Sequence, residues 1–213
     1  IEGSPVVKPN LEQLKSLGNS IAQLHQFGDH SELFRENMML LPTWKFITSE
    51  FSKNETKLNS SEYKYILNNI HKLSDNFPQN LRKINIHADL FKDNIFFKNE
   101  KISGVIDFYF SCNHFFLYDI SIVINDWCFE NDGLEFNKEF FDAIVDGYGL
   151  FRTLNKTELE SFNIILRAAA VRILVTRLHD FIFHPKDAIV VKKNPHQYFN
   201  ILKWHQNNNN LII

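Results

Sequence analysis

Hydrophobic residues recur every three or four positions over most of the chain, and this spacing predicts helices. The first helix is expected from Asn10 to about Phe27, and Gly28 interrupts the pattern that produces it. Residues 29–56 show no such period and are expected to be irregular, apart from a short helix near 31–36. Further helices are expected over these approximate ranges: 60–76, 119–129, 135–149, 155–183 and 195–206.

The middle of the chain has the pattern of strands instead. The segment "RKINIHADL" (82–90) carries a short alternating strand into a loop. After it, "NIFF" (94–97) and "ISGVI" (102–106) are β-rich runs, and the polar run "KNEK" separates them. Two such runs joined by a short polar turn predict a β-hairpin. The expected fold class is α+β and mainly α, with a small hairpin in the middle of the chain.

Polar side chains stand where the hairpin strands begin and end. Asn94 starts the first strand, and Asp107 follows the second. Because an antiparallel return places these two ends side by side, we expect the two residues to be neighbours. Asp89 lies on the loop that leads into the first strand, near the same end. Two carboxylates and one amide oxygen are therefore expected to converge at one rim of the hairpin.

The residue types at this rim favour phosphoryl transfer. Hard oxygen ligands suit Mg²⁺, which takes few protein ligands and completes its shell with water and phosphate oxygens. A carboxylate outside that shell can accept the proton of an attacking hydroxyl group. The spacing agrees: "HADLFKDN" (87–94) fits the kinase pattern H-x-D-L-x-x-x-N. "VIDFY" (105–109) then follows the hairpin, where kinases carry Asp-Phe-Gly.

Composition excludes some classes of protein. The 213 residues, 44% hydrophobic and 23% charged, suit one globular domain or two small ones. The net charge of −2 gives no bulk attraction to nucleic acid or an anionic membrane, so neither is an expected partner. The most apolar helix, near 162–178, contains arginines, which argues against a membrane span. The two cysteines, Cys112 and Cys128, are expected to be thiols in a reducing cytoplasm.

The first nine residues, "IEGSPVVKP", are expected to form an extended connector or hinge, since a glycine and two prolines discourage helix there. Residues 10–213 are then expected to form the main lobe. A connector at the very start suggests that a further segment precedes it.

Three longer segments resemble one family: "HADLFKDNIFF" (87–97), "SGVIDFYFSCNHFFLYDISIVINDWCF" (103–129) and "LRAAAVRILVTRLHDF" (166–181). They are similar to the C-terminal lobe of homoserine kinases of the ThrB type, within the superfamily of aminoglycoside phosphotransferases and choline kinases. The resemblance implies a protein-kinase-like C-terminal lobe and ATP-dependent phosphorylation of the hydroxyl group of L-homoserine, a step toward threonine. The family's N-terminal nucleotide lobe has no counterpart in these residues, so the chain alone is expected to be inactive.

The resemblance also implies roles for five residues. Asp89 would be the catalytic residue that orients, or deprotonates, the hydroxyl group of the substrate. Asn94 and Asp107 would bind Mg²⁺. Glu2 and Gly3 would belong to the hinge on which the adenine of ATP rests.

Other polar residues have simpler roles open to them. An amino-acid substrate needs a cation for its carboxylate and an acid for its ammonium group, which Arg177 and Asp180 could supply. The simpler alternative is that these two residues, three apart, pair with each other on the helix surface. Tyr109 is expected to line the core or the wall of the pocket. Asp119 stands just before an apolar helical run, so capping of that helix is its expected role. His87 is expected to brace the loop through hydrogen bonds.

Other functions fit the same motif. A related kinase could act on choline, an aminoglycoside or another amino alcohol, and a catalytically silent lobe could serve as a binding module. A metal hydrolase that uses His87 and Asp89 fits less well, because a zinc site would need further histidine ligands.

Overall fold

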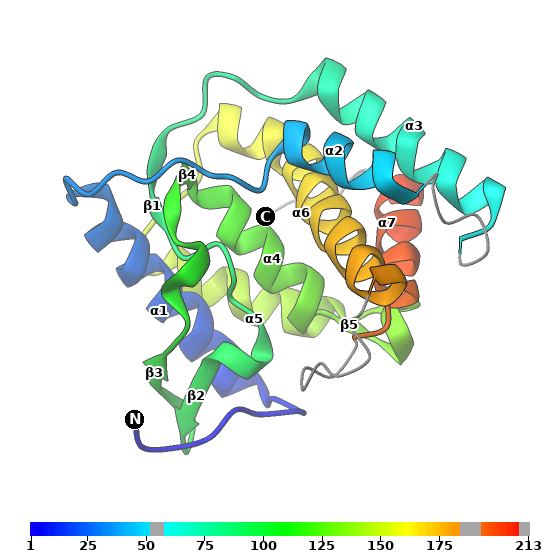
Figure 1. Cartoon of the computed structure of the whole chain (residues 1–213). Coiled ribbons are helices and arrows are strands. Elements are labelled where there is room, and N and C mark those ends of the chain that lie inside the picture. The colour runs from blue at the N-terminus through cyan, green and yellow to red at the C-terminus, as the bar shows by residue number, and fades with distance from the viewer. Residues whose placement is uncertain (52–57, 184–192, 209–213) are drawn as a thin grey trace.

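Helices form most of the structure, and short strand pairs lie between them (Figure 1). The computed structural model describes residues 1–51, 58–183 and 193–208. No helix in this part of the chain is long and apolar enough to cross a lipid bilayer. The helices expected from the hydrophobic period are confirmed, with ends that differ by at most three residues. In chain order the α-helices are α1 (Leu11–Asp29), α2 (Leu41–Phe51), α3 (Ser60–Asn76), α4 (Phe116–Trp127), α5 (Lys138–Gly149), α6 (Lys156–Phe183) and α7 (His196–Asn207).

The strands are short and pair in twos, and each pair is antiparallel. The pairs are β1 (Lys83–Ile86) with β4 (Cys112–Phe115), β2 (Ile95–Lys98) with β3 (Lys101–Val105), and β5 (Phe129–Glu130) with β6 (Glu135–Phe136). Short 3₁₀ turns lie beside them: η1 (Lys92–Asn94), η2 (Phe108–Phe110) and η3 (Asn131–Gly133). This arrangement confirms the expected mainly α fold with small sheets.

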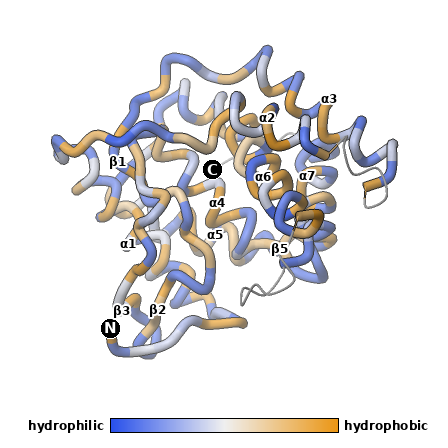
Figure 2. Tube along the Cα trace, in the orientation of Figure 1, coloured by the Kyte–Doolittle hydropathy of each residue, from blue (hydrophilic) through white to orange (hydrophobic). Residues whose placement is uncertain are grey.

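The centre of the molecule is formed by α4 and α6. Every residue of α4 is buried, and α6 packs against α2, α3, α4 and α7. The outer helix α3 is different, because hydrophobic and hydrophilic residues alternate along it (Figure 2). A helix with apolar residues on all sides belongs in the interior. A polar side chain that points inward from α4 or α6 therefore needs a partner or a ligand.

The helices α1 and α5 pack closely because glycines face their contact. A Cβ atom at Gly18 would collide with the backbone of Ile144 on α5, and one at Gly147 would collide with the backbone of Lys15 on α1. Each helix thus approaches a glycine of the other, so a larger residue at Gly18 or Gly147 would push the two helices apart. Since α1 also packs against β1, this contact helps to position the loop that follows β1.

The predicted hairpin is formed by β2 and β3. Ile95 pairs with Val105 at its open end, and Asn99 adopts a left-handed φ of 58° in its turn. The N-terminal residues run along the other edge of β2 (Figure 1). Ser4 and Phe97 exchange two backbone hydrogen bonds there, of 3.1 and 3.0 Å. The first residues of the chain are therefore attached to the hairpin.

One expectation about the segment after α1 is wrong. Residues 31–36 are not helical, and α2 forms instead at Leu41–Phe51, where irregular structure was expected. Residues 52–56 of that segment lie outside the described part of the chain. Pro42 does not prevent the helix, because the first turn does not need its N–H group and tolerates its fixed φ. The inward face of α2 is buried at Trp44, Thr48 and Phe51.

Replacement of Gly18 by alanine is expected to destabilise the fold. Since the new methyl group would overlap backbone rather than a movable side chain, the free energy of unfolding should fall by about 1–3 kcal/mol. Urea denaturation of the purified protein measures this change. The matched control is Gly149→Ala at the end of α5, where a Cβ meets nothing within 4 Å. Equal stability of the two variants would contradict the close contact between α1 and α5.

Candidate active site

The loop between β1 and η1 is held by a buried carboxylate from α4. Asp119 accepts hydrogen bonds from the backbone N–H groups of His87 (2.8 Å) and Ala88 (2.6 Å). Its Oδ2 atom also lies 3.1 Å from Nε2 of His25 on α1. The expectation that Asp119 caps its own helix is wrong, because α4 begins three residues earlier and Phe115 occupies the cap position. The carboxylate instead caps the loop.

A second carboxylate of α4 holds the other end of this loop. Asp126 accepts a hydrogen bond from the backbone N–H of Lys92 (2.9 Å). Burial raises the pKa of Asp126, and the charge of Lys92 opposes that shift. Residues seven apart lie on the same face of a helix, about 10 Å apart along its axis. Two turns of α4 therefore set the span between Ala88 and Lys92.

His87 joins the loop to the end of the hairpin. Its Nε2 atom lies 3.0 Å from the carbonyl oxygen of Ile106, and its Nδ1 atom lies 3.2 Å from the backbone nitrogen of Asp89. A backbone N–H can only donate, so Nδ1 accepts and Nε2 carries the proton. The ring also packs on Phe108, with 4.5 Å between the ring centres. These bonds support the expected bracing role.

The hairpin brings Asn94 and Asp107 to the same end, as the sequence predicts. The backbone N–H of Ile106, which precedes Asp107, donates to the carbonyl oxygen of Asn94 (3.0 Å). Asp107 has left-handed backbone angles (φ 62°, ψ 64°), and its carboxylate accepts the N–H of Tyr109 at 3.3 Å. Asn94 is buried, whereas Asp107 is exposed. The rim of the hairpin thus carries an amide and a solvent-facing carboxylate side by side.

Asp89 sits between this rim and α6. The Nδ2 atom of Asn94 donates to the backbone carbonyl of Asp89 (2.8 Å) and to its Oδ2 atom (3.2 Å). Both terminal nitrogens of Arg172 lie 3.3 Å from Oδ1. Burial raises the pKa of the Asp89 carboxyl, the Arg172 guanidinium opposes the shift, and the charge of Asp107 adds to it. Asp89 is therefore a positioned and partly desolvated carboxyl group, which makes it the candidate proton acceptor of the site.

Arg172 is a site residue that the sequence pattern does not single out. It projects from α6 with its side chain only 5% exposed, and its guanidinium lies 5.0 Å from the ring centre of Phe110. Arginines at positions 167, 172 and 177 point in different directions, as their spacing of five requires. The signal that could identify Arg172 is its place in the alanine-rich, apolar stretch 168–175 of α6, because a buried arginine needs an acceptor.

Arg177 and Asp180 do not form a pair. Arg177 donates to Oε1 of Gln197 (2.7 Å), and its guanidinium lies 4.4 Å from the ring centre of Tyr198. The side chain of Asp180 is 73% exposed and lies 3.5 Å from His179. The two residues that could hold an amino-acid substrate therefore face different surroundings.

The remaining predicted site residues are Tyr109, on the 3₁₀ turn after β3, and Glu2 and Gly3, beside β2. Tyr109 is exposed on η2, and its carbonyl oxygen accepts a hydrogen bond from Arg35. Glu2 forms an ion pair with Lys98 on β2. Gly3 has a φ of 103°, and a Cβ atom there would collide with the backbone of β2. The N-terminal residues thus follow the hairpin edge rather than the loop that carries Asp89.

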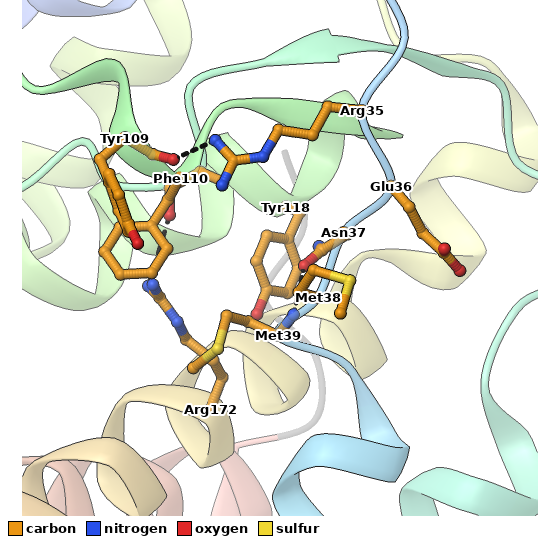
Figure 3. Close-up of a pocket in the computed structure, with 10 residues that line it drawn as sticks. Arg35, Glu36, Asn37, Met38, Met39, Tyr109, Phe110, Tyr118 and Arg172 are labelled. Atoms are coloured by element: carbon orange, nitrogen blue, oxygen red, sulfur yellow. Dashed lines mark hydrogen bonds between the residues drawn. The ribbon is translucent and has the colours of Figure 1, made fainter.

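A pocket of about 230 Å³ opens next to Arg172 (Figure 3), and Ala88, the residue before Asp89, also lines it. Its walls come from the segment before α2, from η2, from α4 and from α6. The lining residues are Arg35, Glu36, Asn37, Met38, Met39, Ala88, Tyr109, Phe110, Tyr118 and Arg172. Arg172 reaches both this pocket and the Asp89 carboxylate, so the pocket and the candidate proton acceptor are adjacent.

The rim has donor atoms that fit a hard divalent cation. Because Nδ2 of Asn94 is used by Asp89, the amide oxygen Oδ1 remains as the ligand atom. Asp107 supplies an exposed carboxylate. Within residues 1–51, 58–183 and 193–208, no group of three or more His, Cys, Asp or Glu side chains could hold a metal ion. Two oxygen ligands suit Mg²⁺ carried by phosphate oxygens better than a dedicated protein cage.

Comparison with known proteins identifies the family. The sequence profile of the phosphotransferase enzyme family matches residues 2–159, which is more than half of the chain. The chain belongs to this family. Among the relatives of this chain, the homoserine kinase of Agrobacterium fabrum is 35% identical over 206 residues, covering 97% of this chain and 64% of the relative. The homoserine kinase of Bartonella tribocorum is 37% identical over 211 residues, covering 99% and 66%.

Solved structures share the fold of this chain. An amicoumacin kinase in complex with AMP-PNP and Ca²⁺ superposes with a TM-score of 0.65 at 19% identity, covering 98% of this chain and 62% of that protein. An ethanolamine kinase of Plasmodium vivax gives 0.64 at 15% identity, covering 96% and 62%. This level of likeness shows the kinase-like fold. The chain spans about 64% of the length of the first of its homoserine kinase relatives.

Removal of the Asp119 carboxylate is expected to cost the protein much of its stability. Asp119→Ala leaves two backbone N–H groups and His25 without their buried acceptor, so the free energy of unfolding should fall by at least about 3 kcal/mol. Chemical denaturation measures the loss. The control is Asp146→Asn on the exposed side of α5, for which a change within about 0.5 kcal/mol is expected. A small effect at Asp119 would show that the loop does not need this carboxylate.

Arg172 is expected to control the protonation of Asp89. Its charge lowers the pKa of that carboxyl, so Arg172→Gln should raise the pKa of Asp89 further. An NMR titration of the carboxyl carbon, with helical content checked by circular dichroism, measures the shift. Arg177→Gln is the matched control on the same helix and should leave the titration unchanged. A pKa that stays constant or falls in Arg172→Gln would contradict the contact.

Proposed function

We propose that the protein to which this chain belongs transfers the γ-phosphoryl group of ATP to the hydroxyl group of L-homoserine. The observation that carries the proposal is the gathering of Asp89, Asn94 and Asp107 at one rim of the β2–β3 hairpin. The relatives named homoserine kinase, at 34–37% identity over nearly the whole chain, support this acceptor. Because the chain spans only part of their length, the activity is proposed for the whole protein.

Asp89 is the residue that we assign to the acceptor hydroxyl. Its carboxylate would accept the hydrogen bond of that hydroxyl group and align the oxygen for attack on phosphorus. Burial makes the carboxylate a better proton acceptor than an exposed aspartate, since it raises the pKa of the group. Arg172 and Asn94 hold one carboxylate oxygen each, which fixes the direction of the attack.

The phosphate side of the reaction is assigned to the hairpin rim. Oδ1 of Asn94 and the Asp107 carboxylate would hold Mg²⁺, which neutralises charge on the phosphate groups when bound. We assign the adenine contact to the hinge at Glu2 and Gly3, with residues 10–213 as the catalytic lobe. Solved neighbours bound to AMP-PNP and to ADP support a nucleotide as co-substrate. The 213 residues alone are expected to show negligible turnover.

Turnover by the full-length protein tests the proposal. With ATP and Mg²⁺, L-homoserine should be phosphorylated faster than choline, ethanolamine or an aminoglycoside, as measured by ADP release and by ³¹P NMR of the product. Asp89→Asn should lower kcat by about 10²–10⁴-fold, because the hydroxyl loses its proton acceptor. Asp93→Asn is the matched control, since Asp93 is exposed and pairs with Lys193 at 2.7 Å. A faster rate with choline, or full activity in Asp89→Asn, would refute the proposal.

A further inference from the structure

The pocket beside Asp89 contains buried polar atoms that have no hydrogen-bond partner. Across the described residues, Nδ2 of Asn37, the hydroxyl of Tyr118 and Nε of Arg172 each lack one. The three residues are 8%, 1% and 4% exposed, and all of them line the pocket. Folded proteins rarely leave such atoms without a partner, because the loss of hydration is then not compensated. Three of them around one pocket point to a ligand.

The surrounding structure holds these atoms in place. Oδ1 of Asn37 accepts the backbone N–H of Met39 (2.8 Å), so Nδ2 of the same amide remains for another contact. Nη1 of Arg172 lies 3.3 Å from the carbonyl oxygen of Ala88, and both terminal nitrogens lie 3.3 Å from Asp89, so Nε remains. The Tyr118 ring packs against His114 with 5.2 Å between ring centres. In Figure 3 the three side chains approach the pocket from three different segments.

These atoms are hydrogen-bond donors, so they favour a ligand with an anionic group. An amide N–H and a guanidinium N–H can only donate, and a tyrosine hydroxyl can donate as well. A second guanidinium, that of Arg35, lies at the wall formed by Tyr109. Glu36 is the one acidic residue among the described residues that line the pocket, and its exposed carboxylate points away from the others in Figure 3. Such a set of donors matches a carboxylate.

We infer that this pocket binds the α-carboxylate of an amino-acid acceptor, through Asn37, Tyr118 and Arg172. The inference rests on the proposed function and deepens it, since the carboxylate held here would leave the side-chain hydroxyl group beside Asp89. The volume of about 230 Å³ is below the range of about 300–1,000 Å³ typical of sites for larger ligands. A small amino acid fits this description, whereas choline and ethanolamine lack the carboxylate.

This inference assigns the carboxylate of the substrate to the pocket and not to Arg177, the residue considered from the sequence. Arg177 is occupied by Gln197 and Tyr198, and neither of these residues lines the pocket. Asp180 is 73% exposed at its side chain and is also absent from the described lining. Tyr109 keeps its expected place as a wall of the pocket.

Binding of two matched ligands to the full-length protein tests this inference. L-homoserine and 3-aminopropan-1-ol share the amine and the hydroxyl group, and only homoserine has the carboxylate. Calorimetric titration in the presence of Mg²⁺ and AMP-PNP should give a Kd for homoserine that is at least about 10-fold lower, because hydrogen bonds to a charged group are strong. Equal affinities would overturn the inference.

Two substitutions locate the contact. Tyr118→Phe should raise the Kd of homoserine by about 10-fold without lowering the melting temperature, since the deleted hydroxyl has no partner in the free protein. Asn37→Asp should weaken homoserine binding at least as much, because it places a negative charge against the carboxylate. Neither change should alter the Kd of 3-aminopropan-1-ol. Unchanged homoserine affinity in both variants would overturn the inference.

A matched control and the turnover assay separate the possible failures. Tyr198→Phe removes another buried tyrosine hydroxyl without a partner in the described residues, outside the pocket, and should leave homoserine binding unchanged. A loss of homoserine affinity in Tyr198→Phe alone would favour Arg177 and overturn the inference. Turnover of homoserine with no carboxylate preference refutes the inference and leaves the proposed function standing. Carboxylate-dependent binding without turnover refutes the proposed function alone.

Discussion

The contact between the Asp119 carboxylate and the loop after β1 is the interaction on which the candidate site depends. Ala88 has a left-handed φ of 62°, a conformation that costs an L-residue about 1–3 kcal/mol. Each hydrogen bond to a charged acceptor contributes about 1.5–3 kcal/mol. Two such bonds therefore outweigh the strain. Without the carboxylate, the backbone that presents Asp89 would relax, and the distances to Arg172 and Asn94 would no longer be defined.

The central helices supply both rigidity and charge. Because α4 is buried along its length, its two carboxylates are placed with the precision of a packed core, and they hold both ends of the loop. From α6, Arg172 brings a guanidinium into the same region and contacts the Asp89 carboxylate. Buried charges are costly unless they are paired, so this arrangement ties the stability of the core to the geometry of the site.

The position of Arg172 also links the two halves of the proposed reaction. Its terminal nitrogens hold the carboxylate of Asp89, its Nε atom has no partner, and the residue lines the neighbouring pocket. One side chain therefore contacts both the group proposed to align the acceptor hydroxyl and the wall proposed to hold the acceptor carboxylate. A shift of α6 would alter both contacts together, so substrate selection and catalysis would share one support.

Six of the seven described α-helices, the β2–β3 hairpin and the meeting of Asn94 with Asp107 could be predicted from the amino-acid sequence. Those features depend on the spacing of residues that are close together in the sequence and on a short antiparallel turn. The helix α2 was missed because residues 29–56 show no clear hydrophobic period, although Pro42 is tolerated in its first turn. Other contacts become visible only in the folded chain: Asp119 caps a loop 31 and 32 residues away, Arg172 reaches Asp89, and Asn37 and Tyr118 line one pocket. These contacts join distant segments, and no local period encodes which buried polar group will find which partner.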